Sequence, residues 1–180
     1  MAFEPAGGHL PRPTRKAPPD LPAGLHRDLL GMAWLVGRWE GSGKATYPGA
    51  EDYDFGQQID FAHNGENYLH YLSQSFELGT DGTPVRPLGM ETGFWRPQPD
   101  GAVEVVMCNP AGYAEVWYGQ ITGARIELAT DAVVRTASAE EYAAGQRLYG
   151  NVDGELLWTF DMAARGQPLQ SHMWGRLRRA

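Results

Sequence analysis

The sequence predicts an all-β protein: a single antiparallel up-and-down barrel of about ten strands, with a short helical plug before the first strand. Two observations carry this prediction. Apolar and polar residues alternate with a period of two over most of the chain, and dipeptides typical of tight turns separate the alternating segments. The 23 glycines and 11% aromatic residues also suit a sheet with tight turns better than a helical bundle.

Length and charge narrow the class of protein further. The chain has 180 residues, 42% of them hydrophobic, which is enough for one sizeable core and leaves little room for a second. A net charge of −7 argues against nucleic-acid binding, which needs a basic face. The single cysteine, Cys108, allows no intramolecular disulfide and no cysteine-based zinc site. With no apolar run of roughly 20 residues and no signal peptide, we expect a cytoplasmic protein that does not bind membranes.

The chain divides into an arm and a body. Residues 1–22 contain six prolines and almost no large apolar side chain, so we expect a flexible arm there and the barrel in residues 23–180. The arm is followed by one helical signal, in which apolar residues fall on one face of a helix at positions 25, 29, 32, 33 and 36. Because this stretch is short and contains Gly31, we interpret it as a plug packed against the end of the barrel.

After Gly37 the period changes to two. Alternating rows cover residues 55–63, 68–76, 103–107, 113–117 and 156–162. The bounding turn dipeptides are Asn64-Gly65, Asp81-Gly82, Asp100-Gly101, Thr122-Gly123, Asp153-Gly154 and Arg165-Gly166. One interruption is predicted, because Ser138-Ala-Glu-Glu resembles a capping box and favours a brief helical turn ending by Gly145.

A barrel of this size can hold a small ligand in its interior. Four polar residues, Gln57, His63, His70 and Gln74, share faces with aromatic residues and are candidates for a mixed lining. They fit the outer surface equally well, because period two alone does not tell which face points inward.

The first strand carries the motif GxWxGxG, read from Gly37, Trp39, Gly41 and Gly43. Glycines at alternate positions let the strand bend and let a neighbouring chain approach closely, and Trp39 supplies a large apolar plate. Further motifs follow in order: Tyr47-Pro48, Glu91-Thr-Gly-Phe-Trp-Arg-Pro97, Met162-Ala-Ala and Pro168-Leu-Gln-Ser-His172-Met. Together these motifs resemble the nitrobindin family of ten-stranded haem-binding barrels, related in shape to fatty-acid-binding proteins, and the resemblance runs from about Leu25 to Arg179.

The resemblance implies one ferric haem b per chain, with His172 as the axial iron ligand and catalytic residue. Neutral imidazole suits iron. The row of His172 also contains Gln170, Trp174, Arg176 and Arg178, and is no more apolar than the opposite row, so the pattern alone does not point His172 inward.

The resemblance places further residues near the haem: Gly49, Leu88, Met107, Asn109 and Met162. Gap-filling in the core explains Met107 and Met162 equally well, and an Asn before a proline is more often a turn residue. Three positions depart from the family pattern. Gly89 stands where many relatives have a distal histidine, Gly49 where they have a threonine, and Ser171 where they have a proline.

The activity implied by the resemblance is isomerisation of peroxynitrite to nitrate, together with binding of nitric oxide. An alternative is a non-enzymatic carrier of a fatty acid or other apolar ligand, in which Arg176 and Arg178 hold a carboxylate near the barrel end. A haem-based store or sensor of nitric oxide is a further alternative. The sequence also leaves a homodimer open.

Overall fold

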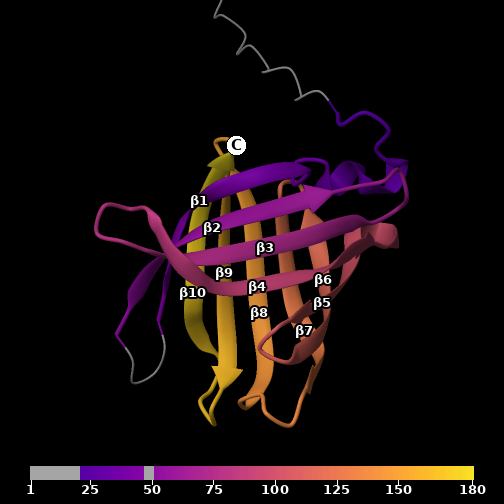
Figure 1. Cartoon of the computed structure of the whole chain (residues 1–180). Coiled ribbons are helices and arrows are strands. Elements are labelled where there is room, and N and C mark those ends of the chain that lie inside the picture. The colour runs from indigo at the N-terminus through magenta and orange to yellow at the C-terminus, as the bar shows by residue number, and fades with distance from the viewer. Residues whose placement is uncertain (1–20, 47–50) are drawn as a thin grey trace, which may run out of the picture.

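Ten antiparallel strands close into a barrel in the computed structural model, which describes residues 21–46 and 51–180 (Figure 1). Every strand pairs with its neighbours along the chain, and β1 pairs with β10 to complete the ring. The strands are β1 Gly37–Ala45, β2 Tyr53–Ala62, β3 Leu69–Leu78, β4 Pro84–Pro97, β5 Ala102–Asn109, β6 Tyr113–Thr122, β7 Arg125–Arg135, β8 Tyr142–Val152, β9 Glu155–Ala164 and β10 Gln170–Arg179. The predicted all-β up-and-down barrel is confirmed.

The turn dipeptides behave as their chemistry predicts. In all six of them the glycine has a positive φ, a conformation that costs glycine little because it has no Cβ. These turns let consecutive strands pair directly. Figure 1 shows the result, with β1 to β4 running across the front of β8 to β10.

One end of the barrel is filled by the segment before β1. The helical signal folds as a short 3₁₀-helix, η1 Arg27–Met32, rather than as a helix reaching residue 36. Leu29 and Met32 are completely buried in the barrel core, and the indole nitrogen of Trp39 donates a hydrogen bond to the carbonyl of Leu35 at 2.7 Å. The segment is therefore the plug that the sequence predicted. A second 3₁₀ turn, η2 Pro99–Gly101, lies between β4 and β5.

The predicted helical turn at residues 138–145 is wrong. The described chain makes a turn there and enters β8 at Tyr142. Tertiary contacts override the capping box, because the ring of Tyr142 is buried against Phe160 and Tyr113, and the backbone of Tyr142 pairs with Ala164 of β9. Arg135 also donates a hydrogen bond to the carbonyl of Ala139 at 2.7 Å, which holds the turn.

The glycines of the GxWxGxG motif allow close contact between strands. A Cβ at Gly41 would overlap the backbone of Arg176, and a Cβ at Gly43 would overlap the carbonyl oxygen of Trp174 and the ring of Phe55. Gly37 has a φ of 120°, which favours glycine. The motif thus allows the close pairing of β1 with β10 that completes the barrel.

The predicted arm, residues 1–22, lies almost wholly outside the described residues. Within the described part of the chain, no helix has the length and apolar character needed to cross a bilayer.

Candidate functional site

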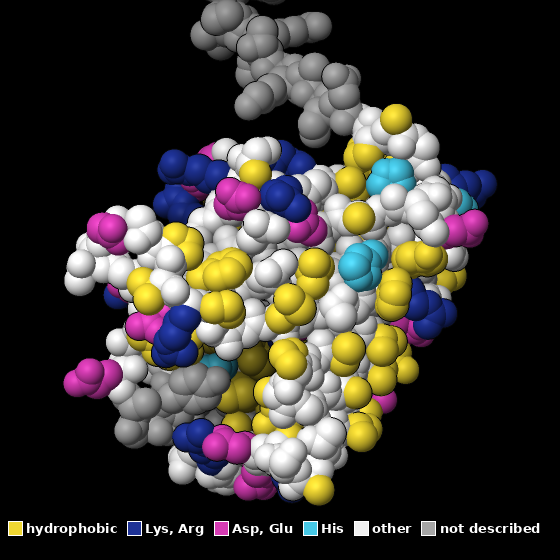
Figure 2. Space-filling model, viewed as in Figure 1, with side chains coloured by type: hydrophobic (Ala, Val, Ile, Leu, Met, Phe, Trp, Pro, Cys, Tyr) yellow, Lys and Arg dark blue, Asp and Glu magenta, His cyan; other side chains and the backbone are white. Residues whose placement is uncertain are grey.

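The barrel encloses a cavity of about 550 Å³ at the end opposite η1. The cavity is lined by residues at the end of the barrel where β1 finishes and β10 begins. They include Thr46 and residues 88–91, 109–111, 140–142 and 170–173. In Figure 2 the molecule is hollowed beside the grey residues, and hydrophobic side chains and a histidine are visible in the hollow. The volume lies in the range typical of small-molecule and cofactor sites.

His172 lies in the wall of this cavity and is only 4% exposed. A β-bulge in β10 explains why the alternating row did not reveal it. The pairing of β10 with β9 shifts between Ser171 and Met173, so His172 points inward while Trp174 and Arg176 point outward. An extra residue in a strand changes which face the following side chains occupy.

A hydrogen bond fixes the ring of His172. Its Nδ1 lies 2.7 Å from the carbonyl oxygen of Thr46, and a carbonyl only accepts, so the proton is on Nδ1. Nε2 is therefore the ring nitrogen whose lone pair can bind a metal. Burial lowers the pKa of His172 below its ordinary value, the hydrogen bond to Thr46 opposes this, and the positive charge of Arg147 adds to it. The neutral form that iron requires is favoured.

The other predicted pocket residues do not all lie at the cavity. Leu88, Asn109 and Met162 line the cavity, and their contact with haem stays a prediction. Met107 is buried in the core beside β4 and is not among the cavity-lining residues, which matches the alternative of a gap-filling methionine. The side-chain oxygen of Asn109 accepts a hydrogen bond from the backbone of Ala111 at 3.1 Å, so Asn109 also serves as a turn residue. Gly49 lies outside the described residues.

Two of the three positions that depart from the family pattern also border the cavity. Gly89 and Ser171 are both lining residues. Among the described residues, a Cβ built at Gly89 would meet Ser75 Oγ alone, at 3.3 Å. None of the four GxWxGxG residues lines the cavity; they belong to the barrel wall and its plugged end.

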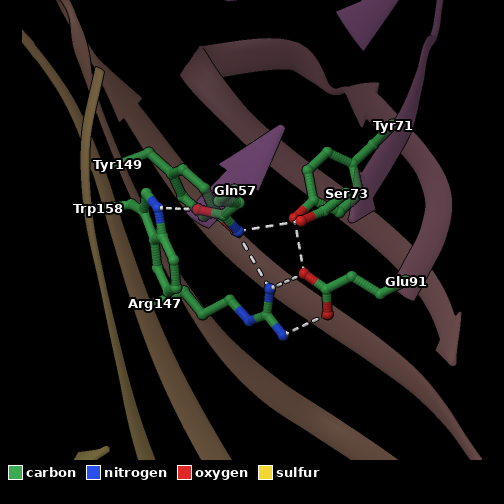
Figure 3. A network of polar contacts seen from close by, with 7 residues as sticks. All are labelled: Gln57, Tyr71, Ser73, Glu91, Arg147, Tyr149 and Trp158. Atoms are coloured by element: carbon green, nitrogen blue, oxygen red, sulfur yellow. Dashed lines mark hydrogen bonds and ion pairs between the residues drawn. The ribbon is translucent and has the colours of Figure 1, made fainter. Parts of the chain in front are cut away.

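A charged network lies deeper in the barrel and was not predicted (Figure 3). Arg147 on β8 donates to both carboxylate oxygens of Glu91 on β4, with Nη1–Oε1 at 2.6 Å and Nη2–Oε2 at 2.8 Å. The hydroxyl groups of Tyr71 and Tyr149 join it, Tyr71 donating to Glu91 at 2.6 Å and Tyr149 accepting from Arg147 at 3.2 Å. The sequence feature that points to this network is the spacing of Arg147 and Tyr149, which stand two positions apart and therefore share one face of a strand.

Arg147 keeps Glu91 ionised. Burial would raise the pKa of Glu91, but the charge and hydrogen bonds of Arg147, with the hydrogen bond from Tyr71, bring the pKa below its ordinary value. Burial raises the pKa of both tyrosines, so their hydroxyl groups stay neutral. The network is an ion pair, neutral overall, in the floor of the cavity.

A neutral chain of hydrogen bonds lies beside this ion pair. The indole nitrogen of Trp158 donates to Gln57 at 2.8 Å, and Gln57 donates to Ser73 at 3.0 Å. Of the four polar residues that the sequence left open, Gln57 thus points inward. His70 does not line the cavity and bonds Thr92 at 2.9 Å; His63 and Gln74 do not line the cavity either.

The prediction that Arg176 and Arg178 hold the carboxylate of a carried ligand is wrong. Arg176 and Arg178 are exposed on the outer face of β10 and both pair with Glu155. Among the described arginines, Arg147 is the one buried inside the barrel, and its two Nη groups are engaged by Glu91. A bound carboxylate would therefore have to compete with a buried ion pair.

Comparison with known proteins adds to this geometry. A profile of the family described as "THAP4-like, heme-binding beta-barrel domain" matches residues 28–179. The chain is 54% identical to a "Ferric nitrobindin-like protein" of Cutibacterium acnes, over 91% of this chain and 99% of that one. It is 49% identical to a "Peroxynitrite isomerase" of a Nocardioides species, over 89% and 98%. The crystal structure of Rv2717c from M. tuberculosis superposes with a TM-score of 0.78 at 34% identity, covering 87% and 99%.

Proposed function

Because this chain belongs to the family of THAP4-like, haem-binding β-barrel domains, we propose that it binds one ferric haem b on His172 and isomerises peroxynitrite to nitrate. Relatives of similar length carry the name peroxynitrite isomerase, and they include proteins of Nocardioides and of Leifsonia xyli. The proposal extends to nitric oxide as a second ligand of the same iron.

The observation that carries the proposal is the position of His172. Its ring is buried in the cavity wall, its tautomer is set by the Thr46 carbonyl, and the edge of Phe160 packs against it with ring centroids 5.6 Å apart. A histidine whose Nδ1 is bonded to a carbonyl is held in the tautomer that ligates iron through Nε2. Apolar lining residues such as Leu88, Phe160 and Met162 suit the flat apolar face of a porphyrin.

When bound, ferric haem supplies a Lewis-acidic iron that can polarise a peroxide bond. The residues of the chain would position the haem and set the charge around it. His172 would hold the iron through Nε2, and the Arg147–Glu91 pair keeps the cavity floor neutral. Position 89, where a distal histidine would stand, is a glycine, so it provides no acid or base for a peroxidase-type proton transfer.

The test is direct. Purified protein supplied with haem is mixed with peroxynitrite in a stopped-flow spectrometer, and the decay rate and nitrate yield are compared with buffer and with an equal amount of free haem. His172→Ala removes the axial ligand and is expected to change the Soret band and abolish the acceleration. His70→Ala is the matched control, because His70 does not line the cavity, and it is expected to behave as wild type.

The outcomes separate the alternatives. No haem binding, or an unchanged Soret band in His172→Ala, would remove the iron-ligand assignment. A normal Soret band that shifts on addition of nitric oxide, with no acceleration of peroxynitrite decay, would leave a store or sensor of nitric oxide. Lipid found by native mass spectrometry in a protein that takes up no haem would favour the carrier.

A further inference from the structure

The mouth of the cavity carries an arginine in an exposed ion pair. Arg165 lies in the turn between β9 and β10 and lines the cavity, and its Nε donates to Glu140 Oε2 at 2.7 Å. Glu140 comes from the connection between β7 and β8, and both connections lie at the end of the barrel opposite η1 (Figure 1). The two side chains are 51% and 65% exposed, respectively. An ion pair that is so exposed contributes little energy, so Arg165 can exchange its partner at low cost.

The other arginine of the cavity has no such freedom. Among the described residues that line the cavity, two are arginines and none is a lysine. The second arginine, Arg147, has a side chain that is 6% exposed, and Glu91 holds it with both carboxylate oxygens. Separating a buried pair leaves an uncompensated charge, which is costly. An anionic group that enters the cavity therefore meets an exchangeable arginine at the mouth and a fully engaged one at the floor.

The backbone of Arg165 is unusual for an arginine. Its φ is 53°, that of Gly166 is 71°, and the amide of Gln167 donates to the carbonyl of Ala164 at 2.9 Å. Turns with positive φ at both central residues favour Gly, Asn or Asp at the first of them, and other residues are strained there. Strain that persists at a cavity indicates that the side chain is used.

The chemistry of haem b matches this arrangement. Haem b is a flat apolar ring with two carboxylates on one edge. Burying a carboxylate without a partner is costly, and the Arg147–Glu91 pair already occupies the floor. The carboxylate edge is therefore favoured at the mouth, in water and beside Arg165. The planar guanidinium group of arginine is suited to bind a carboxylate with two hydrogen bonds.

We propose that Arg165 binds a haem carboxylate and that this contact replaces its ion pair with Glu140. The inference rests on the proposed function, because it requires haem in the cavity. Glu140 then acts as a competitor, which holds Arg165 in the haem-free protein and releases it when haem enters. The turn of Arg165 leads directly into β10, so one hairpin supplies both the carboxylate partner and the candidate iron ligand, His172.

The dissociation constant of ferric haem tests the contact. It is obtained from the rate of haem uptake and from the rate of haem release to an excess of apomyoglobin. Arg165→Asn removes the cation and suits the left-handed backbone, and it is expected to raise the dissociation constant about fivefold. Glu140→Gln removes the competitor and is expected to lower the constant about twofold. Arg176→Gln is the matched control, because Arg176 also has an exposed ion pair but lies on the outer face of β10, and it should match wild type.

Two further measurements distinguish this contact from a purely structural role. Haem dimethyl ester has no free carboxylate and is expected to bind equally to wild type and Arg165→Asn. Haem-free Arg165→Asn is expected to unfold at the same temperature as wild type or at a higher one, because asparagine tolerates a positive φ. Weaker binding of both porphyrins together with a lower unfolding temperature would overturn the proposal. Weaker haem binding by Glu140→Gln would overturn the exchange of partners.

The same samples separate this proposal from the proposed function. A wild-type protein without a Soret band would overturn both. A normal Soret band with the same haem dissociation constant in wild type and Arg165→Asn would overturn the role of Arg165 alone. Haem binding that depends on Arg165 as expected, with no acceleration of peroxynitrite decay, would support the role of Arg165 and overturn the isomerase activity.

Discussion

Arg147 and Glu91 form a two-point ion pair across the barrel interior, although 56 residues separate them in the sequence. The pair joins β8 to β4, and the side chain of Arg147 is 6% exposed. The guanidinium group also lies 4.5 Å from the centre of the Phe160 ring, which itself packs on His172. The ion pair therefore supports both the barrel and the wall that holds the candidate iron ligand.

Removing one partner of this ion pair should lower the free energy of unfolding strongly. Glu91→Gln leaves the buried charge of Arg147 without its counterion, and we expect it to lower the free energy of unfolding by about 3 to 5 kcal/mol. Glu104→Gln is the control, because its pair with Arg96 is largely exposed at 3.1 Å and should contribute less than about 1 kcal/mol. Urea unfolding of the haem-free protein measures both. Equal effects of the two substitutions would contradict the special role of the buried pair.

The same pair predicts how stability depends on acid. Arg147 and Tyr71 hold the pKa of Glu91 below its ordinary value, against the effect of burial. The stabilisation is therefore fully present above the ordinary glutamate pKa of about 4.3 and is lost as the pH falls through the lower folded value. Unfolding curves recorded at decreasing pH should show this loss in wild type and not in Glu91→Gln. A loss that begins near neutral pH would point to another group.

His172 should titrate at unusually low pH in the haem-free protein. Burial lowers the pKa of His172 from the 6.5 of an ordinary histidine, although the bond to Thr46 opposes the shift. Stability linked to the neutral ring is present above that value and is lost as the pH falls through the lower folded pKa. An NMR titration of the imidazole protons measures the midpoint, and His172→Gln should lack the corresponding loss of stability. A midpoint at or above 6.5 would contradict the buried, Nδ1-bonded ring.

The seam between β1 and β10 should not tolerate a methyl group at Gly43. A Cβ there overlaps the carbonyl oxygen of Trp174 and the ring of Phe55, so Gly43→Ala is expected to destabilise the barrel by about 1 to 3 kcal/mol. Gly150→Ala is the matched control, because its nearest neighbour would be the carbonyl oxygen of Ala124 at an ordinary 3.9 Å. Thermal unfolding compares the two. If both substitutions cost the same, the motif glycine does not serve close strand contact.

The sequence by itself determined the class of fold, the number of strands and the family. Alternation with a period of two and the Gly-containing turns are local properties, and each turn folds as its dipeptide predicts because glycine tolerates a positive φ. The nitrobindin resemblance that the motifs suggested is confirmed by the family match over residues 28–179. The identity of His172 as a candidate ligand came from that resemblance, since the alternating row alone did not point His172 inward.

Tertiary structure alone decided which side chains meet inside the barrel. The bulge at Ser171–Met173 reverses the faces of β10, and a bulge depends on pairing with a neighbouring strand. Arg147, Glu91 and Glu115 come from three strands, and their inward positions follow from barrel closure. The helical turn predicted after Ser138 gave way to burial of Tyr142 for the same reason. A period of two gives two faces, and only the closed ring of hydrogen-bonded neighbours determines which face encloses the cavity.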